Sequence, residues 1–276
     1  MRAALFQMTS GIGPAANALA IAEMAARAKA EGADMLFTPE MAGYLDRDRA
    51  RAAGMLRAEA DDPVLAATRE AAAKAGLWVH LGSMPFRDER SDGRWVNRSL
   101  MIDDRGAIRA RYDKIHLFDV DLATGESWRE SSAYGPGERV VAVDTPWGRM
   151  GLSVCYDMRF PDLYRALTDA GATILLVPAA FTVPTGRAHW HILLRARAIE
   201  AGCFVIAAAQ AGRHADGRET YGHSLAVGPW GEVLLDMGEG TGLGFAQVDP
   251  AQVAAVRGRV PAIANRRALP QRVELS

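Results

Sequence analysis

The sequence predicts an α/β layered fold with mixed rather than purely parallel sheets. Short apolar runs, typical of buried strands, alternate with longer amphipathic stretches, typical of helices. Some of the strand-like runs are joined by short turns that suit antiparallel hairpins. The length of 276 residues fits one large layered domain, and 49% hydrophobic with 24% charged residues is ordinary for a globular protein.

The elements follow from this alternation. The expected strands are the apolar runs Ala3–Phe6, Met35–Phe37, Trp78–Leu81, Ser99–Ile102, Gly151–Val154, Thr173–Val177, Phe204–Ala208, Ser224–Val227 and Gly244–Val248. The expected helices are Ala15–Glu31, Val64–Gly76, Asp162–Ala170 and Ala188–Gly202. Glycines stand where three of these helices end, as a left-handed C-terminal cap requires, at Gly32, Gly76 and Gly202.

Two hairpins make the expected sheet mixed. Leu100–Ile102 and Ala107–Arg111 flank a four-residue turn, and so do Leu225–Val227 and Glu232–Leu235. The final segment, Pro261–Ser276, has no clear period and is expected to form an extended arm.

Composition excludes several classes of protein. The net charge of -1 provides no field that would attract nucleic acid or an anionic membrane. No apolar run approaches the roughly 18 residues of a membrane span, and two cysteines cannot form a disulfide scaffold. We expect a cytoplasmic protein with reduced thiols, in which the glycosylation-like triplet Asn97-Arg98-Ser99 has no significance.

Three expected strands run into a reactive side chain. The chain reaches Glu40 after Met35–Phe37, Lys114 after the strand that ends near Arg111, and Cys155 after Gly151–Val154. Ligands of α/β sheets bind beyond the carboxyl ends of strands, so these three side chains could converge on one pocket.

Such a trio would permit nucleophilic chemistry. A thiol is mostly protonated at neutral pH and needs a base, which Glu40 could supply if burial raised its pKa. Lys114 and the Tyr156 backbone N–H could stabilise an oxyanion after attack by Cys155. Lys114 is one of only three lysines beside 29 arginines, which favours a chemical role over a surface charge.

Simpler interpretations of the same residues remain open. Cys155 could be a small buried hydrophobe, Glu40 a helix cap or ion-pair partner, and Lys114 a solvated turn residue.

The motifs at these residues resemble the nitrilase superfamily of carbon–nitrogen hydrolases. They are Phe37–Tyr44, Tyr112–Asp119 and Gly151–Pro161, and the resemblance extends over essentially the full chain. It implies a four-layer α-β-β-α sandwich that forms a homodimer or higher homo-oligomer. It also implies a single domain over residues 1–276, with residues 250–276 as an arm at the dimer interface.

The resemblance assigns the reactive residues. The family's Glu, Lys and Cys fall on Glu40, Lys114 and Cys155, and its second active-site Glu falls on Glu130. Glu126 is the rival for this last position and Glu138 a weaker one.

The subgroup motifs imply a substrate class. Cys155–Pro161 resembles the Nit branch, which includes amidases for deaminated glutathione and for α-ketoglutaramate. The stretches around Arg195–Glu200, Ala207–His214 and Tyr221–Ser224 favour the first. The branch motif Thr-Gly-Pro-Ala-His-Trp reads Thr185–Trp190 here, with Arg187 in place of Pro at an expected pocket-edge loop. The implied reaction is hydrolysis of a small α-keto acid amide in metabolite repair; a non-catalytic scaffold of the same fold is the alternative of another class.

Substrate contacts are expected at three residues. Tyr156 would donate to the oxyanion, and Arg159 would bind a substrate carboxylate, although an ion pair with Asp157 or Asp162 would explain it equally well. Phe181 could line the pocket or pack in the core. For a substrate with a peptide end, the region of Arg213 and His214 is where recognition would be sought.

No metal and no organic cofactor are expected. His189 and His191 are two residues apart on an expected helix and do not share a face. The glycine-rich stretch Gly238–Gly244 precedes a strand, whereas a phosphate loop requires a helix N-terminus.

Overall fold

The fold is built on two six-stranded sheets, as seen in a computed structural model that describes residues 1–88, 92–121, 125 and 127–269. The first sheet has the order β16 (Gly242–Gln247), β1 (Arg2–Gln7), β2 (Met35–Phe37), β3 (Trp78–Phe86), β4 (Val96–Ile102), β5 (Ile108–Asp113). The second has the order β15 (Val233–Asp236), β14 (Leu225–Val227), β11 (Phe204–Ala207), β10 (Ile174–Leu176), β9 (Gly148–Leu152), β8 (Ala142–Thr145).

Both sheets are mixed, as predicted. β1, β2 and β3 run parallel at the centre of the first sheet, and β9, β10 and β11 do so in the second. The flanking strands are antiparallel, and they include the two predicted hairpins, β4–β5 and β14–β15. Three parallel strands in each sheet therefore end at an edge where ligand-binding side chains can gather.

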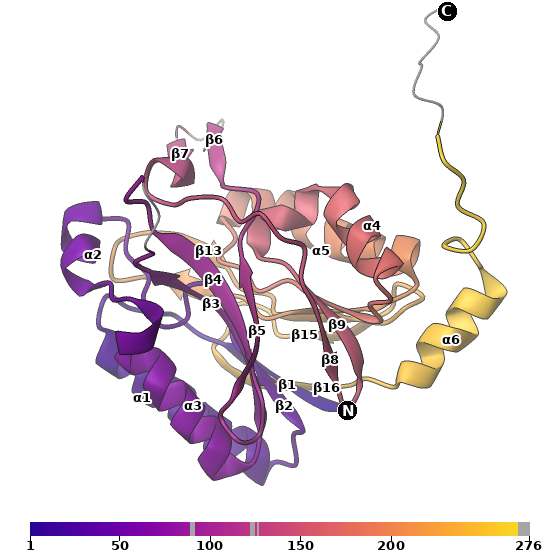
Figure 1. The fold of residues 1–276 in the computed structure, drawn as a ribbon, viewed down its shortest axis with the longest axis horizontal. Coiled ribbons are helices and arrows are strands. Elements are labelled where there is room, and N and C mark those ends of the chain that lie inside the picture. The colour runs from indigo at the N-terminus through magenta and orange to yellow at the C-terminus, as the bar shows by residue number, and fades with distance from the viewer. Residues whose placement is uncertain (89–91, 122–124, 126, 270–276) are drawn as a thin grey trace, which may run out of the picture.

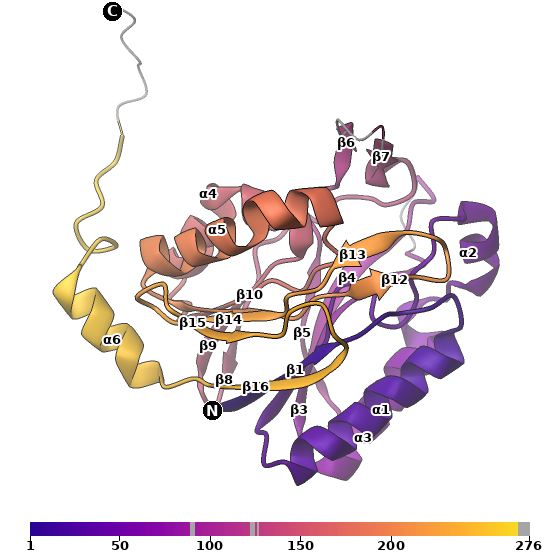
Figure 2. The same cartoon turned by 180° about the vertical axis from the view of Figure 1, so that it is seen from behind.

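Helices cover the outer face of each sheet and complete the predicted four layers (Figure 1, Figure 2). α1 (Pro14–Ala30) and α3 (Pro63–Ala75) lie on the first sheet, whereas α4 (Pro161–Asp169) and α5 (Val183–Ala201) lie on the second. Side chains alternate along β1: Ala4 and Phe6 pack under the helices, and Ala3 and Leu5 belong to the core that includes the second sheet. Burial of a leucine such as Leu5 stabilises the fold by about 2 kcal/mol.

The helix ends carry the predicted caps. Gly76 and Gly202 adopt left-handed conformations, with φ of 57° and 54°, directly after α3 and α5. At the start of α3, the Asp62 carboxylate accepts hydrogen bonds from the amides of Val64 and Leu65, each at 2.9 Å.

Several short elements were not predicted. They are the edge strand β8, α2 (Arg49–Met55), α6 (Pro250–Arg259), the hairpin of β6 (Asp119–Asp121) and β7 (Ser127–Arg129), the hairpin of β12 (Ala211–Arg213) and β13 (Glu219–Tyr221), and the 3₁₀ turns η1 (Glu59–Asp61), η2 (Glu130–Ser132) and η3 (Cys155–Arg159). Three-residue strands leave too short a pattern to detect, because tertiary contacts rather than propensity stabilise them.

The expected C-terminal arm begins with helix α6, which is docked on the body of the protein. Val253 is buried in the core, and the Arg257 guanidinium donates to the carbonyl oxygens of Ala172 at 2.9 Å and Ala201 at 3.1 Å. Beyond α6 the described chain leads away from both sheets (Figure 1). The last residues of the expected arm, 270–276, lie outside the described part.

Among the described residues, no helix combines the length and the apolar character that crossing a membrane demands.

Candidate active site

Glu40, Lys114 and Cys155 meet where strands of the two sheets end. Glu40 follows β2 and Lys114 follows β5 of the first sheet, whereas Cys155 follows β9 of the second. All three are buried, with exposed fractions of 5%, 2% and 7%, and all three line one cavity. The predicted convergence is thus present in the structure.

Cys155 occupies a constrained turn between β9 and α4. Its φ is +50°, a left-handed conformation that costs a non-glycine residue on the order of 1 kcal/mol or more. The Cys155 amide donates to the Pro178 carbonyl at 2.9 Å, which fixes the turn against the strand end of β10. In the described part of the chain the Tyr156 N–H, next along this turn, has no acceptor, so it is available to a ligand.

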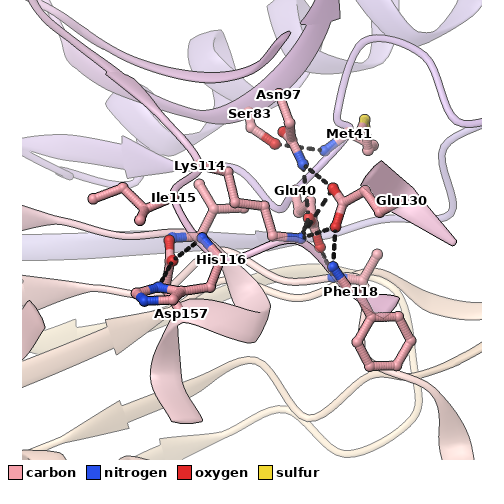
Figure 3. A network of polar contacts seen from close by, with 12 residues as sticks. Glu40, Met41, Ser83, Asn97, Lys114, Ile115, His116, Phe118, Glu130 and Asp157 are labelled. Carbon is pink, nitrogen blue, oxygen red and sulfur yellow. Dashed lines mark hydrogen bonds and ion pairs between the residues drawn. The ribbon is translucent and has the colours of Figure 1, made fainter. Parts of the chain in front are cut away.

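The buried Asp157 holds this turn in place. Its carboxylate accepts hydrogen bonds from the Val154 amide at 2.9 Å, the Tyr112 hydroxyl at 2.7 Å and the His116 amide at 3.0 Å. The His116 ring lies 2.7 Å away through Nδ1 (Figure 3). Asp157 therefore ties the nucleophile turn of the second sheet to the segment of the first sheet that carries Lys114.

Two carboxylates surround the Lys114 ammonium (Figure 3). Lys114 Nζ lies 2.9 Å from Glu40 Oε1 and 2.8 Å from Glu130 Oε2. The Asn97 side-chain amide donates to Oε1 of both glutamates, at 2.9 and 3.2 Å, and the Phe118 amide donates to Glu130 Oε2 at 2.7 Å. The network fixes the position of the ammonium and keeps it charged.

The pKa values follow from burial and from this charge arrangement. Burial by itself would raise the pKa of Glu40, but the Lys114 charge and hydrogen bonds from Lys114, Cys155 and the Ala180 amide hold that pKa below its ordinary value. The expectation of a raised Glu40 pKa was therefore wrong, because it left out a cation supplied by another strand.

Lys114 and Cys155 both favour their protonated forms. Burial would lower the pKa of Lys114, but the charges of Glu130 and Glu40 raise it well above its ordinary value. Burial and the Glu40 charge raise the pKa of the Cys155 thiol, and the Lys114 charge opposes this only in part. At neutral pH the site holds a thiol beside an ionised carboxylate, so the thiol can lose its proton to Glu40 as it attacks.

The cavity above these residues has a volume of about 580 Å³. It is large enough for a substrate well beyond the size of a simple amide, since pockets of roughly 300–1,000 Å³ hold drug-sized ligands. Aromatic rings form much of its wall, contributed by Trp95, Phe118, Trp128, Tyr134, Tyr156 and Phe181.

Two of the three predicted substrate residues line this cavity. Tyr156 and Phe181 do so, and Phe181 also packs on the buried Trp190 at a ring distance of 5.1 Å, so both interpretations of Phe181 hold. Arg159 lies behind them, with its guanidinium carbon 5.9 Å from the Tyr156 ring and 5.5 Å from the Phe181 ring. Its described polar partner is His189 Nδ1, at 3.2 Å, rather than a carboxylate.

The structure brings Glu130, and not Glu138, to Lys114. Glu138 is exposed, and Glu126 lies outside the described residues. The stretch from Thr185 to Trp190, expected as a pocket-edge loop, is instead helical and belongs to α5, which begins at Val183 and has Pro184 in its first turn. Thr185 reaches the cavity, whereas Arg187 is exposed and does not line it.

Sequence reasoning did not identify Asn97 or Asp157 as site residues. Asn97 was noticed only as part of a glycosylation-like triplet, yet it is buried and bridges two glutamates. Asn97 stands in a polar run with Arg98 and Ser99, which gave no local sign that its side chain is buried. Asp157 gave no sign beyond its place two residues after the thiol.

One group of described residues has donor atoms close enough to hold a metal ion. His191 of α5, His223 and Asp236 of β15 bring their donor atoms within 4.8 Å of one another. Here Asp236 bridges the rings, at 2.9 Å from His191 Nε2 and 2.8 Å from His223 Nδ1. None of the three lines the cavity, and His189 is not in the group.

A family comparison covers almost the whole chain. Residues 2–258 match the model of the family described as "Carbon-nitrogen hydrolase". The chain is 41% identical to the deaminated glutathione amidase of Yersinia enterocolitica over 265 residues, which cover 96% of this chain and 92% of that protein.

Solved structures share the fold. The NitFhit protein of C. elegans superposes with a TM-score of 0.89 at 38% identity, covering 96% of this chain and 65% of that one. The amidase of Nesterenkonia sp. AN1, in a mutant form that shows Michael addition of acrylamide at the active-site cysteine, superposes with a TM-score of 0.79 at 29% identity, covering 95% and 98%.

Proposed function

The chain belongs to the carbon–nitrogen hydrolase family, and from this premise we propose that it is a thiol amidase that cleaves deaminated glutathione. It would hydrolyse the amide bond between the α-keto acid portion and cysteinylglycine. The observation that supports the proposal most is the buried meeting of Glu40, Lys114 and Cys155, with the thiol on a constrained turn. A relative with the same substrate in its name is 41% identical over most of both chains.

Acylation would proceed through a thioester. Glu40 takes the proton of the Cys155 thiol as sulfur attacks the amide carbonyl carbon, and the carbonyl oxygen becomes an oxyanion between Lys114 and the Tyr156 N–H. When the C–N bond breaks, Glu40 returns the proton to the departing amine. The products of this step are free cysteinylglycine and a thioester between Cys155 and the former amide carbonyl, with the α-keto acid group at the other end of the acyl chain.

Deacylation would use the same groups in reverse. Glu40 takes a proton from water, whose oxygen attacks the thioester carbonyl, and Lys114 again stabilises the oxyanion. The C–S bond breaks, sulfur regains the proton from Glu40, and the α-keto diacid leaves. Glu130 acts as a positioning residue, since it contacts Lys114 rather than the reacting atoms.

Arg159 is the proposed partner of the α-keto acid carboxylate. Its guanidinium is adjacent to the Tyr156 and Phe181 rings that line the cavity, and the described chain provides it with no carboxylate partner. Rotation of the Arg159 side chain past Phe181 would bring the guanidinium charge to the substrate.

A second candidate is an amidase for α-ketoglutaramate, which has the same α-keto acid portion and loses ammonia instead. The size of the cavity, about 580 Å³, favours the larger substrate. A non-catalytic scaffold is the third reading, and the complete set of reactive residues speaks against it.

The test is hydrolysis of deaminated glutathione and α-ketoglutaramate by the purified protein, read by both primary-amine and ammonia release. We expect a higher kcat/KM for deaminated glutathione and no turnover by Cys155→Ala. Preference for α-ketoglutaramate would support the second candidate. Undiminished amidase activity of Cys155→Ala would refute the mechanism, and no turnover of either amide would refute the substrate assignment.

We also infer a homodimer and a reducing, cytoplasmic location. Large apolar side chains are exposed on α5 and on the β14–β15 turn, including Ile192 at 70% and Trp230 at 59%. The proposed nucleophile must stay a free thiol, and both cysteines are free in the structure.

A further inference from the structure

The rim of the cavity is built from two segments that are far apart in the sequence. One is the segment before α2, which contains Arg47, and the other is the tip of the β12–β13 hairpin, which contains Arg218. Asp216, whose side chain is fully buried, joins them: its carboxylate accepts from the Arg47 amide at 2.9 Å and from Arg218 Nε at 2.7 Å. The two arginines are therefore held at one place on the rim.

Arg218 has a fixed position and unused donors. Its guanidinium carbon lies 5.2 Å from the centre of the Trp128 ring, and its side chain is 17% exposed. The Asp216 carboxylate accepts a hydrogen bond from the Arg218 side chain only at Nε. In the described part of the chain the two terminal nitrogens of Arg218 have no acceptor. Those nitrogens are the fork that binds a carboxylate in two parallel hydrogen bonds.

Arg47 adds a second positive charge beside it. A Cβ on Gly217 would lie 3.3 Å from Arg47 Nη2, so the guanidinium is adjacent to the residue that precedes Arg218. Among the residues that the structure describes, Arg47 forms no ion pair. The other arginines of the rim are engaged, since Arg49 donates to the Arg129 carbonyl at 2.7 Å and Arg129 pairs with Asp121 at 2.8 Å.

Of the acidic groups near this pair, Asp216 offsets one of the two positive charges. Asp46 is bound by Arg51 at 2.6 Å. Glu219 is exposed and stands opposite Arg213 across the β12–β13 hairpin. Arg47, Arg218 and Asp216 together carry one net positive charge.

We propose that Arg47 and Arg218 form a carboxylate-binding site for the far end of the substrate. This inference rests on the proposed function and deepens it. Deaminated glutathione ends in a glycine carboxylate on the side of the leaving group, whereas α-ketoglutaramate has only an amide nitrogen there. The site therefore selects amides whose leaving group is a short peptide with a free carboxylate.

The proposed site lies elsewhere on the hairpin than Arg213 and His214, where recognition of a peptide end was expected. The His214 ring is buried, 2.9 Å from the Ser10 carbonyl and 2.8 Å from the Thr220 hydroxyl, and Arg213 does not line the cavity. Recognition falls instead to Arg218, at the other side of the same hairpin.

The test compares deaminated glutathione with its C-terminal carboxamide, in which the far charge is removed. For the wild type we expect kcat/KM to favour the carboxylate by about tenfold or more, the worth of a hydrogen-bonded charge. In Arg47→Ala and in Arg218→Gln this preference falls toward one. Arg213→Ala removes the same charge from the same hairpin outside the cavity and serves as the matched control, which keeps the wild-type preference.

Two variants keep the test decisive, because Arg218→Gln alters a partner of the buried Asp216 whereas Arg47→Ala breaks no ion pair. A wild-type preference near one overturns the inference, and so does an equal loss on both compounds in the two variants. If the wild type hydrolyses α-ketoglutaramate but cleaves neither deaminated glutathione nor its carboxamide, the proposed function fails and the inference fails with it. Cleavage of both compounds without charge preference overturns the inference alone.

Discussion

Lys114 Nζ lies 2.8 Å from Glu130 Oε2, within a network that also includes Glu40. Both carboxylates and the ammonium are largely withdrawn from water, so each charge depends on the others. The second glutamate adds to the negative charge that keeps Lys114 protonated, which leaves Glu40 able to exchange a proton without removing the charge on Lys114.

Replacing Glu130 should reveal this supporting role. In Glu130→Gln the ammonium loses a charged partner, so the pKa of Lys114 falls and the lysine is less firmly placed. We expect kcat/KM to fall by about a hundredfold and the alkaline limb of its pH profile to move to lower pH. Glu138→Gln, which removes an exposed carboxylate of the next loop, is the control; a loss of rate with an unchanged pH profile would argue against the role.

The pH profile of the wild type should be flat around neutrality. The pKa of Glu40 lies below its ordinary value of 4.5, and the pKa values of Lys114 and Cys155 lie above their ordinary values of 10.5 and 9.0. None of the three groups therefore changes its protonation state near neutrality, and kcat/KM should be constant there. An acid limb with a midpoint near 6 or 7 would contradict the depressed pKa of Glu40.

Much of the site could be predicted because its residues stand at strand ends. Apolar runs mark β2 and β9, and the reactive residue follows each within three positions, so Glu40 and Cys155 could be placed from local pattern alone. Lys114 likewise stands directly after a strand, the second strand of the β4–β5 hairpin. The parallel strand ends then bring the residues together.

The remaining features depend on contacts between distant segments. Asp157 and Tyr112 are 45 residues apart, and Asp216 and Arg47 are 169 apart, so no local pattern predicts either hydrogen bond. The sign of the Glu40 pKa shift depends on Lys114, which is 74 residues away. Arg218 was missed for the same reason, since its role depends on the rim that two separate loops build.

Removing the Tyr112 hydroxyl should destabilise the fold at the nucleophile turn. Its hydrogen bond to Asp157 is 2.7 Å long and buried, and bonds of this kind to a charged group contribute about 1.5–3 kcal/mol. We expect Tyr112→Phe to lower the free energy of unfolding in urea by roughly that amount. Tyr44→Phe should cost less, because Asp46, which the Tyr44 hydroxyl contacts, keeps two hydrogen bonds from Arg51, at 2.6 and 2.8 Å. Equal losses in the two variants would contradict the special role of Asp157.

The proposed homodimer can be tested on the exposed apolar side chains of α5 and the β14–β15 turn. Light scattering should give twice the chain mass of 29.7 kDa for the wild type and the chain mass itself for Ile192→Glu or Trp230→Glu. Leu19→Glu changes an equally exposed side chain, at 61%, on α1 of the opposite outer layer and should leave the dimer intact. A monomeric wild type at micromolar concentration would refute the dimer.

Replacing Glu40 should slow amide hydrolysis and speed alkylation of the Cys155 thiol. Its charge raises the pKa of Cys155, whereas the Lys114 charge lowers it. In Glu40→Gln the raising charge is gone and the lowering charge remains, so the thiolate forms at lower pH than in the wild type. Hydrolysis needs a base and should fall roughly 10²–10⁴-fold, while alkylation by iodoacetamide needs only the thiolate and should be faster at pH 7.

The measurement is the rate of iodoacetamide labelling of Cys155 between pH 6 and 10, followed by intact mass. A labelling midpoint that moves to lower pH in Glu40→Gln, together with lost amide turnover, identifies Glu40 as the base for the thiol. Cys203, which is buried and lies beside Arg257, provides an internal reference, because its neighbourhood does not change in the variant. If hydrolysis and labelling fell together, Glu40 would be holding the turn rather than moving the proton.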